Sequence, residues 1–180
     1  MAHRPANSWR LAFLAIASAA SIACHSTTAA GPDAGRSGPA WQPDSAAILL
    51  HQYTSGLRAA SRSVVTDPVS WATVWERIHS PALPQPRRPA VDFSSDAVLV
   101  ASLGERVTGG FDIRVDSVLS SGGWTAVYVT TSSPGHGCQV PQEVTQPVQA
   151  VRLPRPRGAV YFEDRAVVVE CGVSAAIRGP

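Results

Sequence analysis

The residues best suited to chemistry are two widely spaced cysteines, Cys138 and Cys171, and a histidine, His136, two positions before the first of them. A histidine and two thiolates could supply three ligands to a zinc ion. A disulfide between the two cysteines accounts for the same thiols, and its closed loop would stabilise the fold by about 3–4 kcal/mol on chain-entropy grounds. We favour the disulfide, and expect neither a metal nor a cofactor, because the N-terminal sequence directs the chain to an oxidising compartment.

Other catalytic arrangements are missing from the sequence. The chain contains no lysine, which excludes a P-loop lysine, a Schiff-base lysine and a Ser-x-x-Lys nucleophile pair. The motifs Gly-x-Ser-x-Gly, His-Glu-x-x-His and Gly-x-Gly-x-x-Gly do not occur, and no histidine has an evident carboxylate partner in the sequence. The sequence therefore predicts a protein that is not an enzyme.

The N-terminal residues have the pattern of an export signal. Two arginines precede an apolar run at residues 11–22, which is too short to stay in a bilayer as a spanning helix, and small residues lead up to Cys24. This pattern predicts a lipoprotein-type signal peptide at residues 1–23, lipidation of Cys24, and attachment to the bacterial cell envelope through the N-terminal lipid only. Thr28-Ala29-Ala30 offers an ordinary cleavage site instead, which would release a soluble periplasmic or secreted protein.

The charge of the mature chain gives no support to nucleic-acid binding. Without the two arginines of the signal, 13 basic residues remain against 13 acidic ones. A nucleic-acid interface needs a clustered basic face, which this balanced composition does not indicate.

The rest of the chain predicts a tether followed by one folded domain. Residues 24–43 are small and polar and predict a flexible tether, whereas residues 44–180 are long enough for a single core. Within the domain, Asp67 as a cap and Pro68 as the first helical residue precede apolar side chains at three- and four-residue spacing, which predicts a helix ending at residue 80.

The remaining apolar runs predict strands. They cover residues 48–53, 57–66, 97–103, 111–118, 124–131, 148–153, 160–162 and 166–169. Turn composition between the first two runs predicts that they pair as a hairpin, with a helix over residues 45–53 as the alternative. The fold class expected is mainly β (α+β), with an antiparallel sandwich-like or barrel-like sheet and one main helix.

Two loops in this domain are candidates for partner contact. Gly109-Gly110 lies between two predicted strands and allows a positive φ or close backbone approach, as a hairpin turn or as a loop shaped for a partner. The second loop, residues 134–138, carries His136 and Cys138.

Several short segments together resemble the C-terminal domain of the PrcB family of protease-complex subunits, over residues 44–171. They are Trp71 and Trp75, Val91-Asp92-Phe93, Val98-Leu99-Val100, Thr108-Gly109-Gly110-Phe111, Pro134-Gly135 with Cys138, Thr145-Gln146-Pro147 and Val151-Arg152-Leu153-Pro154. The family usually has tyrosine where Phe111 stands, so any hydrogen bond from that hydroxyl is absent here.

The resemblance implies a non-catalytic exported lipoprotein that binds or stabilises another envelope or secreted protein, with a secreted protease complex as the named example. The residues expected to contact the partner are Arg106, Thr108, Gly109, Gly110, Phe111 and His136. Two alternatives remain open. Residues 108–111 are slightly similar to the Thr-Thr-Gly-Tyr loop of chagasin-type protease inhibitors, and a zinc-dependent hydrolase would use the cysteines as ligands.

Overall fold

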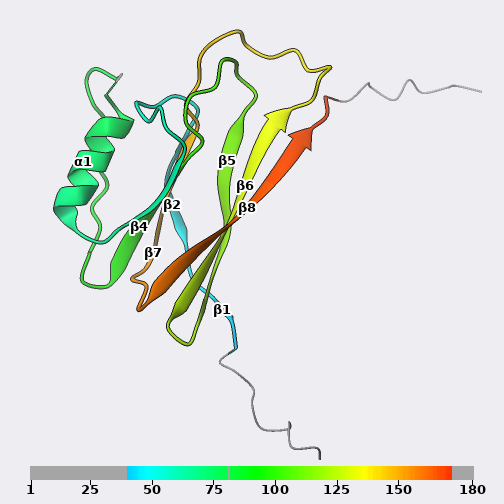
Figure 1. Ribbon diagram of the computed structural model, residues 1–180. Helices are drawn as coiled ribbons and strands as arrows, with labels where there is room; N and C mark the ends of the chain where they lie inside the picture. Colours follow the sequence, from blue (N-terminus) through cyan, green and yellow to red (C-terminus); the bar gives the residue numbers. More distant parts are fainter. Residues whose placement is uncertain (1–39, 81, 172–180) are drawn as a thin grey trace, which may run out of the picture. The chain divides into compact units, whose positions relative to one another are not determined.

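The structure, a computed structural model, describes residues 40–80 and 82–171 (Figure 1). The predicted signal peptide, Cys24 and residues 25–39 of the predicted tether lie outside the described residues. The elements are β1 (Gln42–Pro43), β2 (Ala47–Gln52), β3 (Ser61–Val65), α1 (Pro68–Ile78), β4 (Asp96–Ser102), β5 (Asp112–Ser121), β6 (Trp124–Pro134), β7 (Val148–Pro154) and β8 (Ala159–Val169). Within these ranges, no helix is long and apolar enough to cross a membrane.

The strands form two four-stranded sheets. Sheet A has the order β1-β5-β6-β8, and sheet B has the order β2-β7-β4-β3. The two sheets share a buried core and form a sandwich that does not close into a barrel, which confirms the expected fold class. One departure is that β8 runs parallel to β6, whereas all other neighbouring strands are antiparallel. The parallel pair arises because the chain crosses to sheet B as β7 before it returns as β8.

The core between the sheets is built from alternate side chains of their central strands. Sheet B contributes Leu99 and Val151, and sheet A contributes Ile113, Val127 and Val129, all of them buried. Because side chains of a strand alternate between its two faces, the intervening residues of each strand must face the outer side of the sheet. In sheet B they face the helix.

Helix α1 covers the outer face of sheet B. Asp67 caps it, because its carboxylate accepts hydrogen bonds from the backbone N–H groups of Val69 and Ser70 at 3.0 and 2.8 Å. Trp71 and Trp75 are buried together with Val98 and other outward residues of sheet B. The helix predicted from the sequence is therefore confirmed, and both tryptophans lie on its buried face.

The predicted hairpin of the first two strands is wrong, and so is the alternative helix. Strands β2 and β3 exist, but β2 pairs with β7 and β3 pairs with β4, so they lie at opposite edges of sheet B. Strands β4 and β7 are apolar on both faces and take the central positions. The eight residues between β2 and β3 can span about 26 Å, more than the roughly 14 Å across three strand spacings.

The last two predicted strands are one continuous strand, β8. Residues 163–165 are all charged and break the apolar pattern, but they stay paired with β6 in unbroken register. The charges are accommodated because β8 is an edge strand and its middle is exposed. At the other end of the domain, β1 pairs with β5, so the sheet begins at Gln42, within the segment predicted as tether.

Two polar side-chain contacts join the sheets at their edges. Arg62 of β3 bonds Asp164 of β8 at 2.6 Å, and its guanidinium also donates to the carbonyl of Ser102 at 2.8 Å. On the opposite side, His51 of β2 lies 2.6 Å from Asp112 of β5. The sandwich is thus connected by polar contacts along both of its open sides.

We expect Trp71→Ala to lower the free energy of unfolding by about 3–5 kcal/mol, because the side chain is only 1% exposed and its removal leaves a cavity between helix and sheet. Val69→Ala is the matched control on the same helix, since Val69 is 74% exposed, and should change stability by less than about 0.5 kcal/mol. Urea unfolding followed by circular dichroism measures both. Similar losses in the two variants would contradict the packing described here.

Candidate functional site

Two loops pack against each other at one end of the sandwich. The loop at residues 103–111 precedes β5, and the loop at residues 135–147 connects β6 to β7 (Figure 1). Arg106 and Thr145 exchange two backbone hydrogen bonds of 2.8 and 2.9 Å, and the Thr145 hydroxyl donates to the carbonyl of Thr108 at 2.9 Å. We call this region the loop end of the domain.

The double glycine has a packing role within the loop end. The N–H of Gly109 donates to the carbonyl of Pro141 at 2.8 Å, and a Cβ at Gly109 would lie 3.1 Å from the Pro141 ring. Gly110 has a φ of +84°, and a Cβ there would lie 2.8 Å from a methyl group of Val140. These glycines therefore let the two loops approach, and their contact with a partner stays a prediction.

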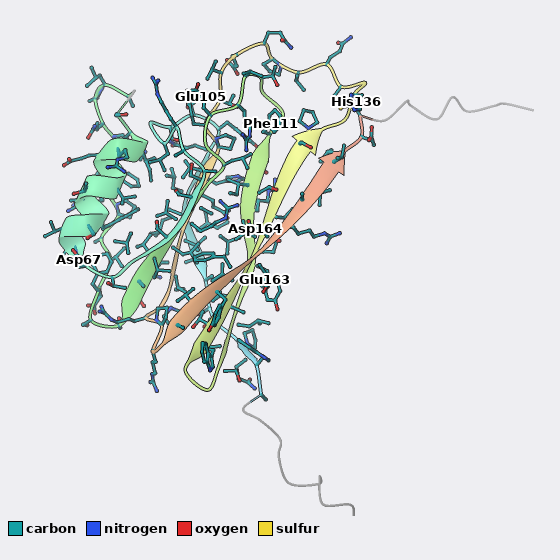
Figure 2. All side chains as sticks on the ribbon, in the orientation of Figure 1. Asp67, Glu105, Phe111, His136, Glu163 and Asp164 are labelled. Carbon is teal, nitrogen blue, oxygen red and sulfur yellow. A yellow bond between two sulfur atoms is a disulfide. The ribbon has the colours of Figure 1, made fainter. Side chains whose placement is uncertain are left out.

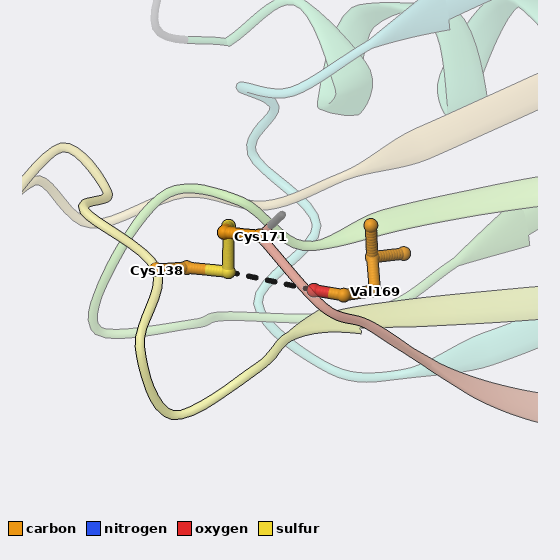
Figure 3. Close-up of a disulfide and its surroundings, with 3 residues drawn as sticks. All are labelled: Cys138, Val169 and Cys171. Atoms are coloured by element: carbon orange, nitrogen blue, oxygen red, sulfur yellow. Dashed lines mark hydrogen bonds between the residues drawn. A yellow bond between two sulfur atoms is a disulfide. The ribbon is translucent and has the colours of Figure 1, made fainter. Parts of the chain in front are cut away.

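The predicted disulfide is present between Cys138 and Cys171, with a Cα–Cα distance of 5.1 Å (Figure 3). It joins the 135–147 loop to the chain just after β8. Beside it, Gly135 donates to the carbonyl of Val169 at 2.9 Å, and the sulfur of Cys138 lies 3.4 Å from the same oxygen. Both thiols are used in this bond, so they are not available as the zinc ligands of the alternative interpretation.

A cavity of about 430 Å³ opens between the sheets at the loop end. Its walls are Leu103, Arg106 and Phe111 on one side, and residues 131–133 of β6 with 166–168 of β8 on the other. The Arg106 guanidinium lies 5.7 Å from the centre of the Phe111 ring. The cavity therefore combines apolar side chains with the hydroxyl residues of β6 and a single cationic side chain.

The structure brings the predicted partner residues to the same end of the domain. Figure 2 shows Phe111 and His136 there, together with Glu105. Thr108, Gly109 and Gly110 lie in the same loop as Phe111, and His136 is exposed in the loop closed by the disulfide.

The contribution of β6 and β8 to this cavity is not evident from the sequence. Residues 166–169 were expected only as a strand, and nothing in one sequence indicates that they face Phe111 across a gap. Exposed valines at the loop end were also missed, namely Val107, Val144, Val168 and Val169. Val168 and Val169 end the apolar run at residues 166–169, whereas Val107 and Val144 stand alone among polar residues.

The structure places beside His51 a carboxylate partner that is not evident in the sequence. Asp112, 61 positions away in sequence, lies 2.6 Å from it. The same carboxylate accepts from the Arg114 guanidinium at 2.8 Å, and this bond raises the pKa of Arg114. Within the hydrogen bonds of the described residues, no hydroxyl or thiol joins His51, so the pair lacks the nucleophile that a base–carboxylate arrangement would activate.

No metal-binding cluster of three His, Cys, Asp or Glu side chains occurs in residues 40–80 or 82–171. Asp67, whose pKa is lowered by hydrogen bonds from Ser70, caps α1 far from Phe111 and His136 (Figure 2). The loop end presents a cavity, exposed apolar side chains and the Arg106 charge.

Comparison with known proteins gives one match. Residues 97–154 match the model of the family described as PrcB C-terminal. This stretch runs from β4 through β7 and includes both loops of the loop end, which confirms over these residues the resemblance seen in the sequence. Neither the curated proteins nor the solved structures contain a match to the chain.

We expect replacement of both disulfide cysteines by serine to lower the free energy of unfolding by about 3–4 kcal/mol, because the bond closes a loop with a sequence separation of 33. Chemical unfolding of the wild type under reducing conditions should show a similar loss. A variant as stable as the oxidised wild type would show that the loop end holds its shape without the bond.

Proposed function

We propose, from the PrcB C-terminal domain at residues 97–154, that this protein is a non-catalytic subunit that binds another exported protein, such as a secreted protease complex, through the loop end. One observation carries the proposal. A partly apolar cavity with one cationic side chain opens to solvent at the end of the domain where the two loops meet.

The surface around this cavity has the composition of a contact site. Val107 is 81% exposed and Val168 is 57% exposed, and Val144 and Val169 are also more than half exposed. Exposed apolar side chains gathered near a concave site are typical of protein interaction surfaces.

The loop end is also held in place before a partner arrives. The backbone bonds between Arg106 and Thr145, the packed glycines and the disulfide restrict both loops. A surface that is already ordered loses less conformational entropy on binding, which favours affinity. Functional loops on a rigid β scaffold are a common arrangement in recognition domains.

The proposal includes export and lipid anchoring through Cys24. The apolar N-terminal run and the cysteine that follows it support this, and the disulfide is suited to an oxidising compartment. Residues 25–39 would then connect the lipid to β1, and the loop end would be free to meet an envelope or secreted partner.

For the anchor, we expect the native protein to extract with the membrane fraction and to have the mass of a chain that starts at Cys24 and carries a diacyl or triacyl group. Intact-mass spectrometry of membrane and soluble fractions measures this. A chain that starts after Ala30 and carries no lipid would contradict the anchor and support a soluble exported protein.

For the binding site, we expect Arg106→Glu and Val107→Glu each to abolish, or reduce at least tenfold, the crosslinked adduct between this protein and its partner in intact cells. Each change places a carboxylate at the loop end. There it would repel an acidic group of the partner, and burying its charge against an apolar surface would cost free energy. Val69→Glu is the matched control, because Val69 is also an exposed valine but lies on α1.

The adduct is measured by crosslinking and mass spectrometry, and circular dichroism confirms that each variant folds. Equal adduct yields in the wild type and both loop-end variants would exclude the loop end as the interface.

A further inference from the structure

Strand β8 has one unpaired edge. It is the last strand of sheet A, and β6 is its only partner among the strands that the structure describes. The carbonyl of Val169 accepts from Gly135, and that of Arg165 accepts from the Thr131 hydroxyl, so both face the β6 side. Because backbone groups alternate in direction along a strand, the N–H and C=O groups of Ala166 and Val168 point to the open edge.

The residues that present this open edge also line the cavity. Ala166 and Val168 face Leu103 and Phe111 across the space between the sheets. A strand added beside β8 would place alternate side chains on this same inner side. One apolar side chain of the added strand would thus enter the cavity.

The other half of the β8 edge is blocked. Asp164 turns toward sheet B and binds Arg62 at 2.6 Å, which places a charged pair at the middle of the strand. Inward-pointing charges on an edge strand are a common barrier to strand addition. The open part of the edge is therefore residues 166–169, which are rich in valine and partly or fully exposed.

The charge at the cavity selects among possible occupants. Arg106 is the only charged side chain in its walls. Its guanidinium contacts the Phe111 ring and the Glu105 carbonyl, and no ion pair joins it to a carboxylate of the described residues. The neighbouring Glu105 carboxylate is directed to Arg58, at 3.8 Å. A carboxylate supplied by a bound segment would complement Arg106.

We propose that residues 166–169 of β8 receive an extended segment of the partner protein as an additional strand, with an apolar side chain in the cavity and an acidic group at Arg106. This inference rests on the proposed function and specifies how the partner is recognised. Backbone hydrogen bonds to Ala166 and Val168 supply affinity, while the cavity and Arg106 supply specificity.

The test starts from a phage-displayed library of linear nonapeptides selected against the purified full chain. We expect selected peptides to alternate β-branched or aromatic residues with polar ones, and to carry Asp or Glu at one fixed position. Fluorescence anisotropy with the synthesised peptides then gives dissociation constants for the wild type and its variants.

The decisive variant is Val168→Pro, which removes a backbone N–H that β6 does not use and is tolerated at a strand edge. We expect it to weaken peptide binding at least tenfold, whereas Val168→Thr, which keeps the N–H, should stay within threefold of the wild type. Arg106→Gln should raise the dissociation constant of the acidic peptide at least fivefold. It should not change the dissociation constant of a second peptide in which Gln replaces the acidic residue.

Three outcomes would overturn the proposal: no enriched peptide, enriched peptides without a shared acid, or equal binding by the proline and threonine variants. A dimer seen by light scattering that dissociates in Val168→Pro, without peptide binding, would assign the edge to a second copy of this chain instead. If the cellular adduct is lost in Arg106→Glu but kept in Val168→Pro, the loop end is the interface and strand addition is wrong.

Discussion

The structure depends on two strands that are apolar on both faces. In β4, Val98 and Val100 face the helix, while Leu99 and Ala101 face sheet A. Strand β7 alternates in the same way. If either face were left in water, the fold would lose the stabilisation that comes from burying several aliphatic side chains, which is roughly 25 cal/mol per Å² of apolar surface. One layer must therefore cover each face, and the domain becomes a helix, a central sheet and a second sheet.

The unequal lengths of the strands then create the candidate site. Strands β6 and β8 have 11 residues each, whereas β4 and β7 have seven. At about 3.3 Å per residue, β6 and β8 are each roughly 13 Å longer than the central strands of sheet B. At the loop end, residues 131–133 and 166–168 line the cavity opposite Leu103, Arg106 and Phe111, which lie in a loop and not in a strand. The cavity is thus a consequence of the architecture.

Features of the fold that depend on residues close together in the sequence could be predicted, and features that depend on contacts between distant segments could not. Helix α1 was predicted because its cap, its proline and the spacing of its apolar side chains are all local. The predicted hairpin of β2 and β3 was wrong because the apolar strands β7 and β4 take the central positions of sheet B and pair with β2 and β3 instead. The cavity could not be predicted, since it depends on which strands are longer than the ones they face.

The loop end shows that one residue pattern can satisfy both folding and recognition. The double glycine is needed for Pro141 and Val140 to pack, and the disulfide holds the end of β8 against the 135–147 loop. Neither feature requires a partner. Among the described residues, Arg106 has no carboxylate partner and the outer edge of β8 has no neighbouring strand, and both lie at the loop end. An exposed, valine-rich strand edge favours association, and the Arg62–Asp164 pair closes the other half of that edge, so the features that the proposed binding role requires lie side by side.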